Sequence, residues 1–366
     1  MYLRDMKRIV FFAAALLLSL SLTAQQKNYF YTEASSLTLG GKIFHDTPNP
    51  YHRVDTVKFK GFTKGENLQV RESSGIYCLF KTNSKNIKVK TVYGKPTFPN
   101  NTMGIAARGY DLYIKDGNKW LWAGQGVPKE TEGEVVCNVV RKMDGSMHEC
   151  LLYLPLFSEV NSVQIGVEEG SVIEPIDNPF RGRVAIFGSS YTHGASCSRS
   201  GMTYPAQFTR STGIQLLSLG CSGNCKLQTY FCDVLCAAKD VDAFVFDSFS
   251  NPNAEMINER LFPFIQKLQA AQPGKPLIFQ QTIRRETRNF NKEADAYEAK
   301  KQAMADSLMK IACKQFKDVY FIKTDATGPT NEATVDGVHP DDYGYTLWEK
   351  SIEKKLKRIL AKYGIR

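Results

Sequence analysis

The chain has 366 residues, of which 43% are hydrophobic and 23% are charged, so it has the composition of a globular protein with room for two domains. This composition excludes a fibrous or low-complexity protein. The formal net charge of +10 would suit a nucleic-acid-binding protein, but the lysines are dispersed along the chain. Lys58, Lys60, Lys88 and Lys90 alternate with apolar residues, as on the solvent-facing side of a strand. We therefore expect no nucleic-acid partner.

Residues 1–24 have the features of a secretory signal peptide. Basic residues, the last of them Arg8, precede an apolar run from Ile9 to about Leu20, and the small residue Ala24 follows. The run is shorter than the roughly 20 residues that cross a bilayer, which favours cleavage near Ala24 over a membrane anchor. No later stretch is long and apolar enough to span a membrane. We expect an exported protein, periplasmic or secreted.

Residues 25–175 are expected to form an all-β domain, a sandwich of the jelly-roll-like kind. Apolar and polar residues alternate in short stretches that clusters of turn residues separate, and helical patterns are few. The stretches with this alternation include Thr56–Gly61, Ile76–Thr82, Ile87–Tyr93 and Val163–Val167.

Residues 176–366 are expected to form an α/β domain, because strand patterns alternate with longer helical ones. The strand patterns lie at Val184–Phe187, Ile214–Leu219, Ala243–Phe249, Pro276–Ile283 and Val319–Thr324. The helical patterns lie near Lys226–Lys239, Ala254–Ala271, Ala294–Phe316 and Tyr343–Lys362. This alternation predicts a parallel sheet that helices cover on both faces. Ligands of such sheets bind beyond the carboxyl ends of the strands, so residues just after each strand are the candidates for function.

The first strand of this half ends at the stretch GSSYTHG, Gly188–Gly194. Gly188 allows a sharp turn, and Ser190 falls near the N-terminus of a helix, where a backbone N–H and the helix dipole stabilise negative charge. Alone, Ser190 could be a turn residue, a phosphate-loop hydroxyl or a nucleophile. A phosphate loop is disfavoured because no lysine follows the glycines. An α/β-hydrolase elbow is disfavoured because it needs a glycine two places after the serine.

The other strand ends supply the groups that a serine nucleophile needs. Gly223, in CSGN, offers an unhindered backbone N–H, and Asn251, in DSFSN, offers a side-chain amide. In DGVHP, Asp336 lies three residues before His339, so its carboxylate can accept from Nδ1 and leave Nε2 free as a base. Ser190, His339 and Asp336 are thus the candidate catalytic triad. The N–H groups of Ser190, Gly223 and Asn251 are the candidate oxyanion hole.

Each of these segments could be an ordinary turn when taken alone, but their arrival in this order after four strands favours a catalytic site. The nearest rival base is His193, three residues past Ser190. We expect His193 to be a helix or rim residue.

The blocks GSSYTHG, CSGN, DSFSN and DGVHP resemble, in order and spacing, the four blocks of the SGNH (GDSL-type) hydrolases. The resemblance covers about residues 183–362 and implies a flavodoxin-like three-layer sheet. It also matches Ser190 to the family nucleophile, Gly223 and Asn251 to its oxyanion donors, and His339 with Asp336 to its base and orienting acid. The stretch Gly194–Pro205 is similar to an exported two-domain branch in which a β-sandwich precedes the hydrolase.

The chain departs from the family pattern at two places. Ser189 stands where the family has an aspartate before the nucleophile, and Asp247–Asn251 reads DSFSN in place of the common Gly-x-Asn-Asp. Neither departure removes a member of the candidate triad or oxyanion hole, but the second leaves the alignment around Asn251 less certain.

The resemblance implies an exported serine esterase that acts on short-chain, acetyl esters of carbohydrates. A lipid ester hydrolase or lysophospholipase is one alternative, and a non-catalytic glycan-binding protein is another. We expect a small-molecule or glycan ester as the partner. No cofactor and no metal are expected, because the five histidines are scattered and no cysteine pair has zinc-ligand spacing with histidines. Nine cysteines, an odd number, are expected to be mostly buried thiols, with Cys197 and Cys225 as the one pair that export could oxidise.

Overall fold

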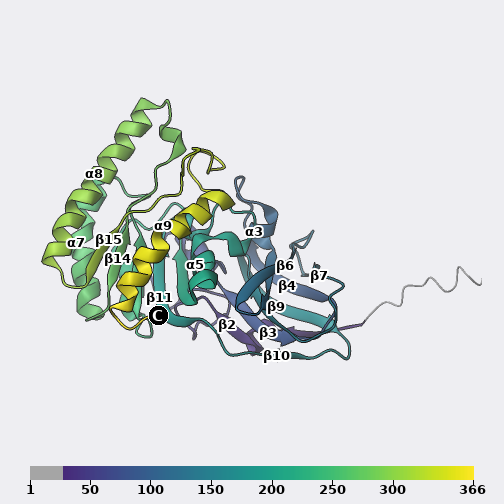
Figure 1. The fold of residues 1–366 in the computed structure, drawn as a ribbon. Helices are drawn as coiled ribbons and strands as arrows, with labels where there is room; N and C mark the ends of the chain where they lie inside the picture. The colour runs from purple at the N-terminus through teal and green to yellow at the C-terminus, as the bar shows by residue number, and fades with distance from the viewer. Residues whose placement is uncertain (1–27) are drawn as a thin grey trace, which may run out of the picture.

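The computed structural model describes residues 28–366, so the expected signal peptide lies outside the described residues. Within that range the chain forms three β-sheets. Two antiparallel sheets come from the first half of the chain and pack face to face, and a parallel sheet with helices on both faces comes from the second half (Figure 1). The predicted fold class, an α/β parallel-sheet unit preceded by an all-β unit, is confirmed. The domain boundary expected at residues 175 and 176 falls between two strands and stays a prediction.

The antiparallel half is built from two sheets and a few short helices. The first sheet has the order β1 (Tyr29–Glu33), β9 (Ser158–Glu168), β4 (Ile87–Pro96), β7 (Glu134–Val140). The second has the order β10 (Ile173–Pro175), β3 (Tyr77–Thr82), β8 (His148–Tyr153), β5 (Tyr110–Asp116), β6 (Lys119–Gly126), and β2 (Thr38–Gly40) pairs with β3. The short helices are η1 (Ala34–Ser36), α2 (Lys64–Gln69) and α3 (Gly104–Arg108).

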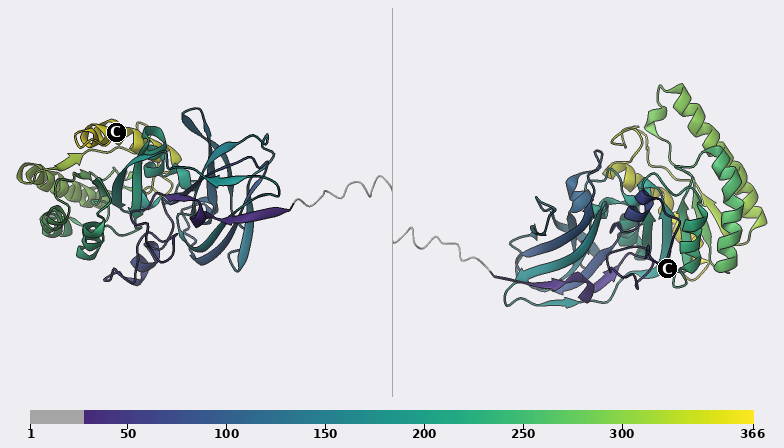
Figure 2. Two further views of the ribbon diagram at one scale, coloured as in Figure 1. Left: turned by 90° about the horizontal axis from the view of Figure 1, so that it is seen from below. Right: turned by 180° about the vertical axis from the view of Figure 1, so that it is seen from behind.

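The second of these sheets is covered on both faces, and strand β3 shows why. Cys78 and Phe80 point into the core between the two antiparallel sheets. Tyr77 and Leu79 point the other way and pack against Phe180, at the start of the parallel half. Alternation along a strand sends neighbouring side chains to opposite faces, so an unbroken apolar run is buried on both. The two halves therefore share an apolar interface, and Figure 2 shows them lying against each other.

One strand expected in this half is absent. Residues Thr56–Gly61 form turns, with Val57 75% exposed. The Asp55 carboxylate accepts from the backbone N–H groups of Val57 and Lys58, at 2.8 and 3.1 Å. This side chain satisfies the backbone locally, which removes the need for a strand partner. The strand predicted from alternating apolar and polar residues was wrong here, because the Asp55 side chain stabilises a turn in its place.

The parallel sheet has the order β12 (Ile214–Gly220), β11 (Arg181–Gly188), β13 (Ala243–Asp247), β14 (Leu277–Gln280), β15 (Val319–Ile322). In chain order this is 2-1-3-4-5, the flavodoxin-like arrangement. One face is covered by α5 (Tyr204–Thr212) and α9 (Asp342–Ala361), and the other by α6 (Thr229–Ala237), α7 (Ala254–Ala271) and α8 (Lys292–Gln315). Shorter helices are α4 (Ser190–His193), η2 (Ser200–Met202) and η3 (Glu286–Arg288).

Helix α5 has no counterpart among the helical patterns read from the sequence. A parallel strand pair requires a crossover, and α5 supplies it between β11 and β12. Its limits follow ordinary capping chemistry: the Thr203 hydroxyl accepts from Ala206 N–H at the start, and Gly213 takes a left-handed conformation at the end.

All nine cysteines are free thiols, so Cys197 and Cys225 form no disulfide. Both are buried, but Cys197 belongs to the apolar cluster under α5 and α9, whereas Cys225 belongs to the cluster under α6, α7 and α8. The sheet separates the two sulfur atoms. Among residues 28–366, no helix is both long enough and apolar enough to cross a membrane.

Candidate active site

Ser190 opens helix α4 directly beyond the end of strand β11. Ser189 is the N-cap, and its hydroxyl oxygen accepts from the Tyr191 N–H at 3.2 Å. Gly188 is required at the turn because a Cβ there would overlap the Thr192 side chain. Ser190 is only 5% exposed, so its hydroxyl is held in one place and largely shielded from bulk water.

The segment after β15 brings a histidine and an aspartate to the same place. The Ser190 hydroxyl donates to His339 Nε2, with Oγ and Nε2 2.9 Å apart. His339 Nδ1 lies 2.8 Å from Asp336 Oδ2. The other carboxylate oxygen, Oδ1, accepts from the backbone N–H groups of Val338 and His339 at 3.0 and 2.8 Å. The three-residue spacing therefore forms the tight turn that orients the ring.

The charge state of Asp336 follows from these contacts. Burial raises the pKa of its carboxyl, but hydrogen bonds from the His339 backbone, from Asn101 and from the His339 ring outweigh burial and hold the pKa below its ordinary value. An ionised carboxylate only accepts, so His339 Nδ1 carries the proton and Nε2 has its lone pair toward Ser190. This tautomer is the one in which Nε2 can take a proton from the serine.

The two other predicted site residues lie on neighbouring loops. Gly188 pairs with Gly220 of β12 and with Asp247 of β13, so the three strands end at one level. Gly223 lies in the turn after β12 with φ of 72°, a conformation that favours glycine. The Asn251 amide donates to the Asn224 carbonyl at 2.7 Å, which ties the loop after β13 to the loop of Gly223.

The structure thus joins Ser190, His339 and Asp336 by direct contacts, and it gathers Gly223 and Asn251 on loops beyond adjacent strands. In the described part of the chain, no hydrogen bond links Gly223 or Asn251 to Ser190. The catalytic and oxyanion roles of the five residues stay predictions.

Ser189, which stands where the family has an aspartate, donates hydrogen bonds to the carboxylate of Asp247. Asp247 is buried, and its Oδ2 accepts from the Ser189 N–H and hydroxyl at 3.1 and 2.7 Å and from the Thr192 hydroxyl at 3.1 Å. Its Oδ1 accepts from the Ser250 hydroxyl at 2.7 Å. A carboxylate from the end of β13 therefore braces the turn that carries Ser190, while position 189 supplies a hydroxyl.

His193 is a helix residue, as expected, but it is fully buried and does not lie on the rim. Its Nε2 lies 2.8 Å from the Leu156 carbonyl oxygen and 3.2 Å from Glu72 Oε2. Its Nδ1 accepts from the Ser222 N–H at 3.3 Å, and its ring stacks on Phe157 with centroids 4.1 Å apart. Both ring nitrogens are thus occupied, so His193 cannot serve as the base for Ser190.

Sequence reasoning missed a buried ionic cluster behind the loop of Asn251. The Ser250 carbonyl accepts from Arg285 Nη2 at 2.7 Å and from Lys301 Nζ at 2.9 Å. The Glu298 carboxylate pairs with both cations, at 3.0 Å to Arg285 and 2.7 Å to Lys301. Burial lowers the pKa of Lys301 to about 8. Glu298 and Lys301 are three residues apart in α8, but their contacts to Arg285 and to the Ser250 carbonyl join separate elements, so no local pattern could have indicated the cluster.

Two further residues that the sequence did not reveal come from the antiparallel half. Asn101 contacts Asp336 and His339 through its side-chain amide. Asp111 lies in the stretch GYDLY on strand β5, where it is buried and accepts from the Gly201 N–H at 2.8 Å and from Arg199 Nη1 at 3.0 Å. The signal that the sequence offers for Asp111 is an acidic residue inside the apolar stretch Tyr110–Ile114, since a charged residue is rarely buried unless it is paired.

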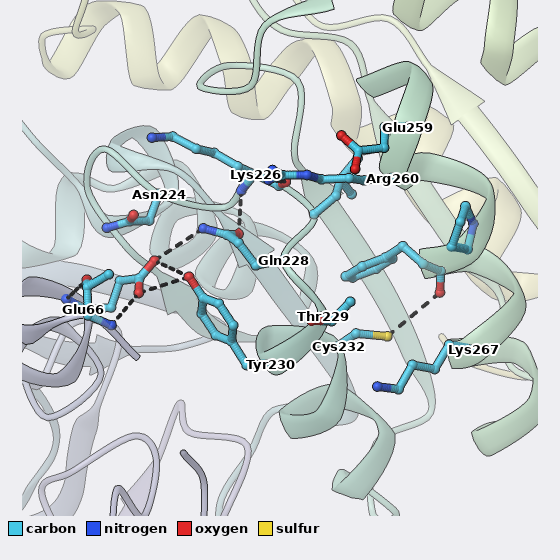
Figure 3. Close-up of a pocket in the computed structure, with 14 residues that line it drawn as sticks. Glu66, Asn224, Lys226, Gln228, Thr229, Tyr230, Cys232, Glu259, Arg260 and Lys267 are labelled. Atoms are coloured by element: carbon cyan, nitrogen blue, oxygen red, sulfur yellow. Dashed lines mark hydrogen bonds between the residues drawn. The ribbon is translucent and has the colours of Figure 1, made fainter. Parts of the chain in front are cut away.

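Two cavities lie near these loops. One, of about 670 Å³, opens between the start of α6, helix α7 and Glu66, and Asn224 is part of its wall (Figure 3). The other, of about 640 Å³, lies between residues 100–103 and the segment that includes Val335 and Tyr343. Neither cavity is lined by Ser190. Across residues 28–366, no group of three or more histidine, cysteine, aspartate or glutamate side chains is placed to hold a metal ion.

Comparison with known families matches almost all of the described chain. The sequence model of the GDSL-like lipase/acylhydrolase family matches residues 181–357. The model described as the N-terminus of SGNH hydrolase-type esterases, named for the motif GxDLY, matches residues 28–173. No curated protein matches the chain.

Among solved structures, a protein described as a GDSL-like lipase from Bacteroides ovatus ATCC 8483 is 37% identical, with a TM-score of 0.86, over 93% of this chain and 99% of that one. A salicylyl-acyltransferase from a tetracycline biosynthetic pathway is 17% identical, with a TM-score of 0.64, over 93% and 98% of the two chains. A family two carbohydrate esterase from Cellvibrio japonicus is 10% identical, with a TM-score of 0.61, over 92% and 99%. The last two likenesses show the fold alone.

The fold and the matched families define an SGNH-type hydrolase. The chain belongs to the GDSL-like lipase/acylhydrolase family, and as a member of that family it is a carboxylic ester hydrolase.

Proposed function

We propose that this protein is an exported serine esterase that removes short acyl groups, acetyl above all, from carbohydrate esters, with Ser190, His339 and Asp336 as its catalytic triad. The observation that carries the proposal is the continuous hydrogen-bonded path from Ser190 Oγ to His339 Nε2 and from His339 Nδ1 to Asp336, with distances of 2.9 and 2.8 Å. These are hydrogen-bond distances between nucleophile, base and orienting acid. Export is inferred from the basic and apolar residues of positions 1–24.

The proposed reaction begins when Ser190 Oγ attacks the ester carbonyl carbon and its proton passes to His339 Nε2. The tetrahedral oxyanion is stabilised by the N–H groups of Ser190 and Gly223 and by the Asn251 amide. Asn251 uses one amide hydrogen on the Asn224 carbonyl, which leaves its second hydrogen for the oxyanion. The bond to the alcohol oxygen breaks, and His339 returns its proton to that oxygen. Water then repeats the sequence on the acyl-Ser190 and releases the carboxylic acid.

Carbohydrate is favoured as the alcohol by the combination of a β-sandwich with the hydrolase fold, which the family two carbohydrate esterase shares at the level of fold. A short acyl group is favoured because residues 181–366 contain no long apolar stretch after a strand that could cover an acyl chain. The alternative, a lipid ester, predicts that long acyl chains are the better substrates.

The test is a panel of acetylated xylan, acetylated pectin and aryl esters of increasing chain length, with the released acid measured by mass spectrometry. We expect acetyl esters to be hydrolysed fastest. Ser190→Ala and His339→Ala should each lower kcat by at least about 10³-fold on 4-nitrophenyl acetate without loss of the fold. Full activity of Ser190→Ala would remove the proposed nucleophile, and a preference for long acyl chains would replace carbohydrate with lipid.

A further inference from the structure

A loop from the antiparallel half reaches the acid and base of the candidate triad. Residues 97–103 join β4 to α3, and the Asn101 side chain donates from Nδ2 to Asp336 Oδ2 at 2.9 Å. This is the same oxygen that accepts from His339 Nδ1. Asn101 Nδ2 also lies 3.2 Å from His339 Nδ1, but Nδ1 already uses its proton on Asp336, so this second approach is packing against the ring.

The orientation of the Asn101 amide is fixed by its neighbour. The Thr102 hydroxyl donates to Asn101 Oδ1 at 3.3 Å, which leaves Nδ2 as the end that faces Asp336. Thr102 is buried, and its Oγ1 accepts in turn from the Ser196 N–H at 3.0 Å. Ser196 lies just beyond α4, the helix that begins with Ser190. The loop is therefore anchored beside the nucleophile helix and presents its amide to the orienting acid.

We propose that Asn101 is a positioning residue of this active site, acting through Asp336 to hold His339 in register with Ser190. The inference rests on the proposed function. Because 35% of the Asp336 side chain is exposed, water competes for its oxygens, and a fixed amide donor restricts the carboxylate to the rotamer that receives His339 Nδ1. The antiparallel half thus supplies a member of the catalytic arrangement.

The first experiment compares Asn101→Ala with Asn100→Ala, a matched control in the same loop whose side chain is exposed. We expect Asn101→Ala to lose about tenfold in kcat on 4-nitrophenyl acetate, the usual scale for an outer partner of a catalytic group, with KM changed less than about twofold. Asn100→Ala should keep the wild-type kcat, and both variants should keep the wild-type Tm. Equal kcat values for the two variants would overturn the proposal.

The second experiment uses Asn101→Asp, which has the same shape but places a second carboxyl against Asp336. At low pH the pair shares a proton, and the protonated group can donate as the amide does. As pH rises the proton is lost and the two charges repel. The ratio of variant to wild-type kcat should therefore fall steadily between pH 5 and pH 8. A ratio independent of pH would show that position 101 acts only through folding.

A third readout needs no substrate. In ¹⁵N-histidine-labelled protein, the Nδ1 proton of His339 should give a downfield resonance that broadens by exchange in Asn101→Ala and persists in Asn100→Ala. If the His339 resonance in Asn101→Ala were the same as in the wild type, the positioning role would be refuted, whether or not the wild-type protein hydrolyses the test esters. Conversely, undiminished activity of Ser190→Ala would refute the proposed function while leaving this contact to be judged by the resonance.

Discussion

His193 offers the sharpest test of how the two halves of the chain support the site. Its ring is fully buried between Phe157, Glu72 and the Leu156 carbonyl of the antiparallel half, and it accepts from Ser222 of the parallel half. Burial lowers the pKa of His193 despite its contact with Glu72, so the neutral ring donates from Nε2 and accepts at Nδ1. Two substitutions separate its packing from its polar contacts.

His193→Ala removes an aromatic-sized side chain from a dry core, which costs about 3–5 kcal/mol in large-to-small series. It also leaves the Ser222 N–H without its acceptor and removes the contact to Glu72 Oε2, at about 1–3 kcal/mol for each buried polar group. Because these terms overlap, we expect a total loss of about 4–6 kcal/mol, a large part of a typical 5–15 kcal/mol of folding free energy. His193→Phe keeps the stack on Phe157, so it should lose only the polar part, about 2–4 kcal/mol.

The assay is urea unfolding followed by circular dichroism, with kcat measured in parallel on the folded fraction. We expect the order of stability wild type, His193→Phe, His193→Ala, with kcat reduced far less than by His339→Ala. A His193→Phe variant as stable as the wild type would show that the buried polar contacts contribute nothing. A variant that is fully stable but as inactive as His339→Ala would contradict the purely structural role of His193.

Two more predictions follow from buried acids and bases. The pKa of His193 is lower in the folded than in the unfolded chain, so as pH falls the unfolded chain takes up a proton first. The free energy of unfolding should therefore be constant above about pH 6.5 and decrease as pH drops below it. The urea midpoints at pH 7 and pH 5 should differ less in His193→Phe than in the wild type, and equal differences would contradict this. Asp247→Asn replaces the carboxylate that accepts hydrogen bonds from Ser189 and Thr192 with a neutral amide, so kcat should fall about tenfold with little change in KM. An unchanged kcat would show that the contacts of Asp247 below Ser190 are not needed for activity.

Much of the fold could be predicted because local patterns and tertiary packing agree. Strand β4 is an example, since Ile87, Val89 and Tyr93 are buried and the lysines between them are more exposed, as the alternation predicts. The failures have physical causes. At Thr56–Gly61 the Asp55 side chain satisfies the backbone and no strand forms. The sequence pattern does not indicate helix α5, because it is only nine residues long, follows a stretch that contains serine and glycine, and has a proline in its first turn.

The candidate acid and base could be placed from sequence because their geometry is local. Asp336 and His339 are three residues apart, and the turn between them forms the contact. The strand ends then placed Ser190 close to this pair, since parallel strands end at one edge of a sheet. Asn101 could not be found in this way, because 235 positions separate it from Asp336 and its loop carries no motif.

The antiparallel half also contacts the loop after β12, which carries Gly223. Arg53, fully buried, donates from Nη1 to the Gly220 carbonyl at 2.8 Å, and the Gln69 amide donates to the Ser222 carbonyl at 2.9 Å. These two carbonyls flank the turn that leads to the candidate oxyanion glycine, whereas Asn101 holds the acid and base. Any shift of one half against the other would therefore move the oxyanion loop and the acid–base pair, each of which must stay within hydrogen-bond reach of the same serine. In a positioned site, an error of 1 Å costs on the order of a hundredfold in rate. Under the proposed mechanism, we therefore expect the apolar interface between the halves to matter for catalysis as well as for stability.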